Sequence, residues 1–566
     1  MPLGGAELPS SPPPHKFKEP WKWYHYFTWN IDHKVIGIQY LVTAFLFYLI
    51  GGAMAMGIRT ELYTSQSDFL SPDLYNAFLT NHGTIMIFFW IVPAAIGGFG
   101  NYLLPLMIGA EDMAFPNLNA LAFWLNPPAA LMLMGSFMFG GAQSGWTSYP
   151  PLSLVTANTA QSMWCLSIIL VGTSSILGAL NFVITLVKMR IPDMKWTDLP
   201  LFCWAMMATA VLALVSTPVL AVAMILMLFD INFGTGFFRP EMGGDVVIYQ
   251  HLFWFYSHPA VYLMILPIFG IMSEVIPVHA RKPIFGYKAI AYSSLAICFV
   301  GLFVWVHHMF TSGTPPWMRM FFTISTLIVA VPTGVKIFSW VGTLWGGKIR
   351  YTTAMLFAIG LLSMFVIGGI TGVTLGTAPF DIHVHDTYYV VGHFHYVLFG
   401  GSVFGLYAGL YHWFPKVTGH MLNEFWGKVH FALTFVGTHL TFLPMHQLGM
   451  QGMPRRVAMY DPQFEALNHL CTFGSMVLGF STLIFLANAL WSWSQGPVAG
   501  RNPWHALTLE WQTASPPIVE NFEEPPVLWT GPYEYGIDTL TDDERPAKDL
   551  LAEVAAEISI SAERDQ

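Results

Sequence analysis

The chain has 566 residues, of which 54 % are hydrophobic and only 10 % are charged, and its formal net charge is −9. Soluble globular proteins carry about 25 % charged residues, so this composition excludes an ordinary soluble domain and indicates a polytopic membrane protein. The negative charge comes largely from the C-terminal end and gives no indication of a nucleic-acid partner.

The expected fold class is an all-α integral membrane protein, a bundle of twelve transmembrane helices. Residues 1–34 are Pro-rich and polar and are expected to form an N-terminal arm, without the apolar run of a cleaved signal peptide. Residues 35–493 contain apolar segments of about 20 residues or more, the length of a membrane span. Residues 494–566 form a Pro-rich and then acidic tail, and its last twenty residues are compatible with a short surface helix. The expected spans are Val35–Met56, Thr84–Met107, Leu121–Gly141, Gln161–Val187, Leu199–Leu228, Gln250–Ile276, Ala289–Phe310, Phe321–Trp345, Thr353–Leu375, Thr387–Phe414, Trp426–Leu448 and Cys471–Trp493.

The distribution of basic residues predicts the orientation of the chain. Most lysines and arginines of the loops lie on the side of the N-terminus, for example Lys188, Arg190, Arg281 and Lys282. The positive-inside rule therefore places both termini in the cytoplasm. The four cysteines are scattered over apolar segments, so neither a disulfide framework nor a zinc site is expected.

Histidines inside the expected spans are the strongest candidates for function, because burying ionisable groups in a bilayer is costly. Residues two apart on an α-helix point about 200° away from each other, so His393 and His395 cannot bind one metal and can serve two centres on opposite faces. His258 and Tyr262 are four apart and share a face. The six intramembrane histidines are His82, His258, His307, His308, His393 and His395.

Neutral imidazole is a standard ligand for copper, iron and zinc. The neighbours His307 and His308 are hard to explain as packing in an apolar helix, and with His258 they would make a trigonal nitrogen site suited to copper. The other three histidines suit axial ligation of two haems, one with two histidines and one with an open face. Taken alone, His82 is more often a hydrogen-bonded interface histidine, and a His–Tyr pair on one face is more often packing.

Several motifs together resemble the haem–copper oxidase superfamily, in particular subunit I of bacterial cytochrome c oxidases. The resemblance covers nearly the whole chain. It rests on FGNYLLPLMIGAEDMAFPNLN, WFYSHPAVY, VWVHHMFTSGTP, VPTGVKIFSW, HDTYYVVGHFHYV and MPRR.

The resemblance implies cofactor sites residue by residue. His82 and His395 would ligate the low-spin haem a, His393 the high-spin haem of the a type, and His258, His307 and His308 the copper ion. Tyr262 would be covalently linked to His258 and would supply an electron and a proton to O2. The remaining implied contacts are Arg59 with the haem a formyl group, Arg455 and Arg456 with haem propionates, His385 and Asp386 with a magnesium ion, and Glu61 with a second cation near the surface.

The resemblance also implies two proton channels. Lys336 with Thr333 matches the lysine channel, although a lone intramembrane lysine can also extend its head group to the interface. Asp112 matches the mouth of the second channel, with Asn101 and Asn119 along it, although a loop carboxylate is by default solvated.

One position departs from the commonest form of the family. The glutamate that usually follows the copper histidine by two residues is Ala260 here, and the preceding turn reads Tyr256-Ser257. This resembles a sub-branch with a Tyr-Ser pair in place of the glutamate. We therefore expect Tyr256 and Ser257 to relay protons.

The implied activity is reduction of O2 to water with electrons from cytochrome c, coupled to proton pumping. The implied partners are a subunit II with a dinuclear copper centre, either separate from or fused to cytochrome c, a subunit III and small subunits. A quinol oxidase on the same scaffold is the alternative, but the His and Gln of those relatives are missing from SPDLYNAFLT. Tyr262, Lys336 and Asp112 argue against a nitric oxide reductase. A secondary transporter would show inverted repeats with broken helices, and no such pairing is found.

Overall fold

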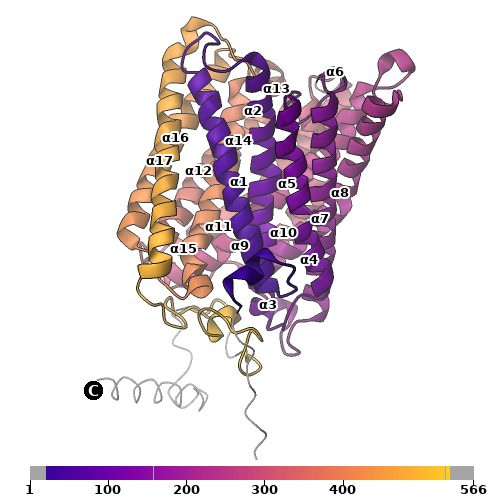
Figure 1. The fold of residues 1–566 in the computed structure, drawn as a ribbon. Helices are drawn as coiled ribbons and strands as arrows, with labels where there is room; N and C mark the ends of the chain where they lie inside the picture. Colours follow the sequence, from indigo (N-terminus) through magenta and orange to yellow (C-terminus); the bar gives the residue numbers. More distant parts are fainter. Residues whose placement is uncertain (1–20, 157, 529–530, 536–566) are drawn as a thin grey trace, which may run out of the picture.

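The computed structural model describes residues 21–156, 158–528 and 531–535. Within these ranges the chain is helical, and the only β-pairing is at two isolated bridges, Thr387 with Pro454 and His420 with Val498. The long helices stand side by side as one bundle, and a C-terminal segment without long helices lies across one end of it (Figure 1).

The α-helices of the described residues are α1 (His33–Glu61), α2 (Pro72–Thr84), α3 (Asn101–Ile108), α4 (Pro116–Trp124), α5 (Asn126–Gly135), α6 (Leu152–Val155), α7 (Asn158–Lys188), α8 (Leu201–Phe233), α9 (Val246–Ala280), α10 (Tyr287–Gly301), α11 (Pro316–Leu344), α12 (Thr353–Leu375), α13 (Ala378–Val384), α14 (Tyr388–Val397), α15 (Phe404–Thr418), α16 (Glu424–Met450) and α17 (Glu465–Gln495). Short 3-10 helices are η1 (Trp23–Phe27), η4 (Ser136–Phe139), η5 (Trp196–Asp198), η6 (Pro240–Met242), η7 (Trp305–Met309), η9 (Pro462–Phe464) and η10 (Leu509–Gln512), and π-helical segments are η2 (Ile85–Ile91), η3 (Pro93–Gly100) and η8 (Leu398–Val403).

The helices account for the expected spans. In the described part of the chain, nine helical runs are long and apolar enough to cross a membrane. The other three expected spans correspond to α10, to the run α14–η8–α15 and to α16. Helix α16 is continuous but contains His430, His439 and His446, which make it less apolar than the other spans. The twelve-span bundle expected from the sequence agrees with this architecture.

Two of the expected spans are present but contain a break in the helix. The span Ala289–Phe310 is not one helix, because α10 ends at Gly301 and both adjacent histidines lie on the separate 3-10 turn η7. A glycine is the weakest point of such an apolar run, and hydrophobicity alone does not reveal the break. The span Leu121–Gly141 divides at Leu125, where Asn126 is followed by two prolines that cannot donate to a preceding turn.

Polar residues define where many helices begin. The side chain of Asp32 accepts hydrogen bonds from the backbone of Lys34 and Val35 at the start of α1, and Thr387 accepts one from Tyr389 at the start of α14. These caps satisfy backbone donors that a helix leaves open at its first turn. Helix α9 packs on α8, and α14 packs on α12 and α16. His258, His393 and His395 therefore lie on helices that pack against other helices of the bundle.

The segment after α17 packs onto the bundle. Lys416 at the end of α15 donates hydrogen bonds to the carbonyls of Arg501, Thr513 and Ala514, at 3.0, 2.8 and 3.2 Å. Trp511 and Asn521 of the segment are buried. The segment therefore covers the end of the bundle where α1 begins. The surface helix expected in the last twenty residues lies outside the described residues.

Candidate metal centres and proton routes

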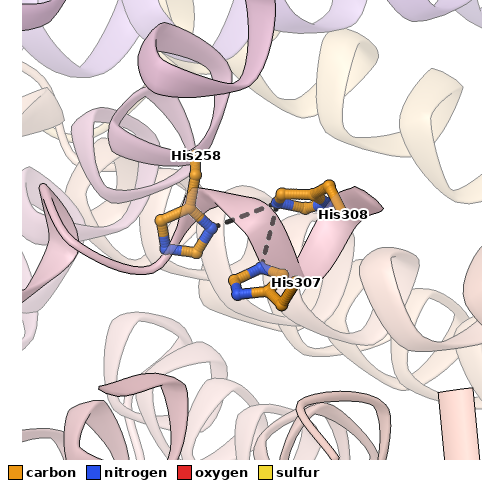
Figure 2. Close-up of side chains that lie close together, drawn as sticks. All are labelled: His258, His307 and His308. Atoms are coloured by element: carbon orange, nitrogen blue, oxygen red, sulfur yellow. Dashed lines mark hydrogen bonds between the residues drawn. The ribbon is translucent and has the colours of Figure 1, made fainter. Parts of the chain in front are cut away.

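Three histidines converge in the middle of the bundle. His258 lies on α9, and His307 and His308 lie on η7 (Figure 2). His308 Nε2 is 3.1 Å from His258 Nδ1 and 3.0 Å from His307 Nε2. Among the described residues this is the only group of three or more His, Cys, Asp or Glu side chains whose ligand atoms all approach one another. Three neutral nitrogens without a carboxylate or thiolate suit copper and leave a position open.

Neighbouring side chains hold the three rings in place. Thr326 Oγ1 is 2.9 Å from His307 Nδ1, and the indole of Trp254 stacks on His308 with the ring centres 3.8 Å apart. The ring of Tyr262 meets His258 edge-on at 4.6 Å. His258 Nε2 is buried and has no hydrogen-bond partner in the described structure. Nδ1 is therefore the nitrogen of His258 that faces the cluster, while Nε2 remains available to another group.

The three histidines expected to bind haem iron share one hydrogen-bonding arrangement. The Nδ1 atom of His82 is 2.9 Å from Gly51 O, that of His393 is 3.0 Å from Gly368 O, and that of His395 is 2.8 Å from Val391 O. A carbonyl oxygen only accepts, so Nδ1 carries the proton in each ring. The lone pair is left on Nε2, as in ligand histidines that a backbone carbonyl orients. These residues fit axial ligation of two haems.

His393 and His395 face different neighbours on either side of α14. His393 contacts Thr371 of α12 at 3.1 Å, whereas His395 stacks on Phe442 of α16 with ring centres 4.3 Å apart. His393 lies close enough to His307 to interact electrostatically, and His395 does so with His82. The helix therefore separates two histidine groups, as the two-residue spacing predicts.

Arg59 has the unsatisfied donors that a polar cofactor substituent would require. Its Nη2 donates to Asn468 O at 2.9 Å and to Thr472 Oγ1 at 3.0 Å. Its Nε and Nη1 are buried without a partner in the described structure. Burying unpaired donors of a guanidinium costs several kcal/mol, of the order of a broken buried charged hydrogen bond, so an acceptor group fits here. Asn468 and Thr472 were not expected from the sequence, because they lie more than 400 positions away along the chain.

The residues expected at the magnesium and propionate sites lie in the connection before α14 and in the segment after α16. Arg455 Nε donates to Asp386 Oδ1 at 2.7 Å, and His385 Nδ1 is 2.9 Å from Asp381 Oδ2. Burial alone would raise the pKa of Asp386, but the positive charge of Arg455 outweighs it, with His385 and Arg456 acting in the same direction, and holds that pKa below its ordinary value. Asp386 therefore stays an anion.

Glu61, expected at a second cation, is fully buried at the end of α1. Its Oε2 accepts hydrogen bonds from the backbone of Phe69 at 3.0 Å and Leu70 at 2.6 Å. Its Oε1 has no partner among the described residues. The carboxylate thus keeps one oxygen available.

A small cavity lies against two of the residues expected in the second proton channel, Asn101 and Asn119. It measures about 40 Å³ and is lined by Asn101, Asn119, Asn126 and Ser174, among others. Asn101 Oδ1 and Asn119 Nδ2 are buried without protein partners in the described structure. A volume of ~10–15 Å³ is enough for one water molecule, so this cavity can hold water against both amides.

The cavity leads toward the Tyr-Ser pair. Phe88 is one of its lining residues, and the ring of Tyr256 stacks on Phe88 at 6.2 Å. Tyr256 and Ser257 are both buried, and Ser257 Oγ has no protein partner in the described structure. Asn126 and Ser174 were missed in the sequence, although an Asn followed by two prolines is an unusual pattern within an apolar span.

Asp112 lies in the loop between α3 and α4, outside the membrane-spanning helices. Burial raises the pKa of its carboxyl to about 7. The carboxyl accepts a hydrogen bond from the backbone of Met113 at 2.6 Å. A pKa near neutrality allows Asp112 both to take and to release a proton under physiological conditions.

Lys336 is buried in the middle of α11 and does not extend to an interface. Its Nζ donates to Ser294 Oγ at 2.6 Å and to Ile290 O at 3.0 Å, both on α10. The hydroxyl of Thr333 donates instead to Val329 O at 2.9 Å. Ser294 is therefore the nearest polar partner of Lys336. The sequence did not predict this pair, because the two residues lie on separate helices and no spacing along the chain relates them.

Comparisons with known proteins agree with this geometry. Residues 35–477 match the family described as cytochrome c and quinol oxidase polypeptide I. Cytochrome c oxidase subunit 1 of Thermostichus vulcanus is 76 % identical over 538 residues, which cover 95 % of this chain and 98 % of that protein. The protein of the same description from Synechocystis sp. is 66 % identical, covering 94 % of this chain and 97 % of its own length.

A solved structure supports the fold. A chain from a haem–copper terminal oxidase dimer superposes with a TM-score of 0.72 over 93 % of this chain and 99 % of its own length, at 19 % identity.

Proposed function

Because the chain belongs to the cytochrome c and quinol oxidase polypeptide I family, we propose that it is the catalytic subunit of a terminal respiratory oxidase, which reduces O2 to water with electrons from cytochrome c and pumps protons. The observation that carries the proposal is the convergence of His258, His307 and His308 on one side of α14, close to His393. His82 and His395 belong to the other side.

We assign each cofactor to the histidine ring nitrogens that other protein groups leave free to act as ligands. His82 and His395 would hold a low-spin haem a, His393 a high-spin haem of the a type, and His258, His307 and His308 a copper ion. When bound, these groups supply electron transfer and the place where O2 is reduced. A magnesium ion would bind at His385 and Asp386, and a further cation at Glu61 is supported by its unpartnered Oε1. Arg59 would donate to the haem a substituent, and Arg455 and Arg456 to propionates.

The chain's own residues deliver protons and one electron. Tyr262, beside His258, is the phenol positioned to give a proton and an electron at the reaction site, and the free Nε2 of His258 supports a covalent link to it. Lys336, with Ser294 on one side and Thr333 a turn away, would carry protons along one route. Asp112, Asn101 and Asn119 would bring them along the other to Tyr256 and Ser257, which replace the channel glutamate of other relatives. This arrangement supports the Tyr-Ser sub-branch.

The protein would work with a subunit II that carries a dinuclear copper centre, a subunit III and small subunits. It would lie in the bacterial inner membrane with both termini in the cytoplasm, where Asp112 takes up protons. The residues 1–34 and 494–566 flank the catalytic membrane domain of residues 35–493.

Spectra and oxygen uptake together test the proposal. Reduced-minus-oxidised spectra of the purified complex are expected to contain two haem a signals, of which CO shifts one. Oxygen uptake is expected with reduced cytochrome c as donor. A single haem, or uptake sustained by quinol and not by cytochrome c, would refute the assignment.

A further inference from the structure

Two buried histidines outside the metal centres touch each other at the end of the bundle that carries Asp112. His279 lies at the end of α9 and His412 on α15, and they are 1 % and 0 % exposed. His279 Nε2 is 3.1 Å from His412 Nδ1, and His279 Nδ1 is 3.1 Å from Thr352 Oγ1. At this separation one imidazole donates to the other, and the two rings can share a proton between them.

The far side of His412 is polar and unsatisfied. His412 Nε2 is buried without a protein partner in the described structure, and so are Glu510 Oε2 and Trp511 Nε1. The ring centres of Trp511 and His412 are 5.4 Å apart, and Glu510 is hydrogen-bonded to Trp413, the residue after His412, so the three residues are neighbours. Buried polar groups left without partners generally bind internal water. A water molecule between the imidazole and the carboxyl would give these atoms the partners that they lack.

The carboxyl of Glu510 is held at one oxygen only. Its Oε1 accepts from Thr508 Oγ1 at 2.7 Å and from Trp413 Nε1 at 3.4 Å. Burial raises the pKa of this carboxyl, with the hydrogen bond from Thr508 opposing the shift. A carboxyl that burial pushes toward its neutral form, with a free oxygen near a histidine pair, is suited to holding an exchangeable proton.

The charged groups around the site are mainly basic, but the buried carboxyl of Glu274 on α9 also interacts electrostatically with Glu510. Arg350 and Arg281 lie close enough to His279 to interact with its charge, and Lys416 does so with Glu510. Arg281 and Lys416 both donate to carbonyls of the C-terminal segment, Arg281 to Trp504 O at 3.0 Å and Lys416 to Thr513 O at 2.8 Å. These cations disfavour a permanent second charge on the imidazoles, so an added proton would be held by the cluster as a whole rather than by one ring.

A metal ion does not fit this place as well as a proton does. In the part of the chain that the structure describes, the only convergent ligand group is that of His258, His307 and His308. His279 and His412 therefore lack a third ligand within reach, and their facing nitrogens are at hydrogen-bond distance from each other. Two ligands alone are too few for a structural or catalytic zinc site.

We propose that His279, His412 and Glu510, linked by buried water, form a separate proton-holding site beneath the C-terminal segment. The site lies beside the second proton route. The hydroxyl of Tyr102 donates to Lys416 O at 3.3 Å, and Tyr102 is adjacent to the cavity residue Asn101. The proton held by His279, His412 and Glu510 would come from the same aqueous side as the proton that Asp112 takes up. Only this origin of the proton, on the side of Asp112, rests on the proposed function.

Infrared difference spectroscopy on the resting oxidised complex tests the site without turnover, so its outcome is independent of oxygen reduction. A change of pH in the wild type is expected to produce a carboxyl band and imidazole bands. Glu510→Gln is expected to lose the carboxyl band, and His412→Gln and His279→Gln to shift it. His420→Gln is the matched control, because His420 Nδ1 contacts Gly496 O at 2.8 Å at the start of the C-terminal segment. The control is expected to keep the carboxyl band at its wild-type position.

Two results would overturn the proposal. One is a Glu510→Gln spectrum that superimposes on that of the wild type. The other is a carboxyl band that neither histidine substitution shifts. If the variants do not assemble, wild-type complex labelled with 15N-histidine still decides the question. Nuclear magnetic resonance is expected to detect coupling between two imidazole nitrogens across one hydrogen bond, outside the metal centres. The absence of this coupling would refute the shared proton.

Discussion

Gly372 on α12 is the residue against which the ring of His393 packs, and it offers a sharp test of the high-spin haem site. A Cβ atom added at Gly372 would lie 2.8 Å from His393 Cε1. Ordinary contacts begin at 3.4 Å, so in Gly372→Ala the imidazole must move by about 0.6 Å. The same ring is held by its 3.0 Å hydrogen bond from Nδ1 to Gly368 O, which opposes the movement.

The magnitude follows from the cost of overpacking a filled site, about 1–3 kcal/mol. If this cost falls on the ligand, binding of the high-spin haem weakens by about 5- to 150-fold. His82 and His395 do not contact Gly372, so the low-spin haem is expected to remain. The measurement is the CO-induced spectral change per reduced low-spin haem in membranes that contain the variant.

Gly369→Ala is the control, because a Cβ atom at this position of the same helix has no neighbour within 4 Å. The control is expected to match the wild type. Equal CO-reactive fractions in Gly372→Ala and Gly369→Ala would show that His393 does not hold the CO-binding haem. Equal loss in both variants would trace the effect to the helix rather than to the ligand.

Three further predictions concern protons. Because the pKa of Asp112 is raised to about 7, its carboxyl holds a proton below that pH and loses it above. Proton uptake is therefore expected to decline as pH rises through about 7, and Asp112→Asn is expected to lose this pH dependence. A flat pH profile in the wild type would contradict the prediction. Lys336→Met is expected to slow reduction of the CO-reactive haem in stopped-flow measurements, whereas Lys348→Met, at an exposed position after the end of α11, is expected to leave the rate unchanged. Equal rates in the two variants would remove Lys336 from the route. Tyr256→Phe is expected to lower the number of protons pumped per electron while both haem spectra stay intact, and unchanged pumping would exclude its hydroxyl from the relay.

The sequence carried most of the information about which residues are candidates to bind metal. Histidines within apolar segments are costly in a bilayer, so each of the six marked a candidate site before any fold was known. The spacing of His393 and His395 also contained geometry, because helical periodicity alone sends them to opposite faces. The number of spans followed from segment length in the same way. The predicted spans and the opposite faces of α14 agree with the structure because they depend on local properties of the chain.

Contacts between distant segments could not be read in this way. Hydrophobicity did not reveal that the helix before His307 ends at Gly301. It also did not reveal the pairing of Lys336 with Ser294, 42 positions apart, or that of His279 with His412, 133 positions apart. Such pairs arise only when helices pack and each buried polar group must find a partner. The chain by itself therefore determined the spans and the candidate ligands, and only the packed bundle decided which of these side chains lie close enough to share a proton or a metal.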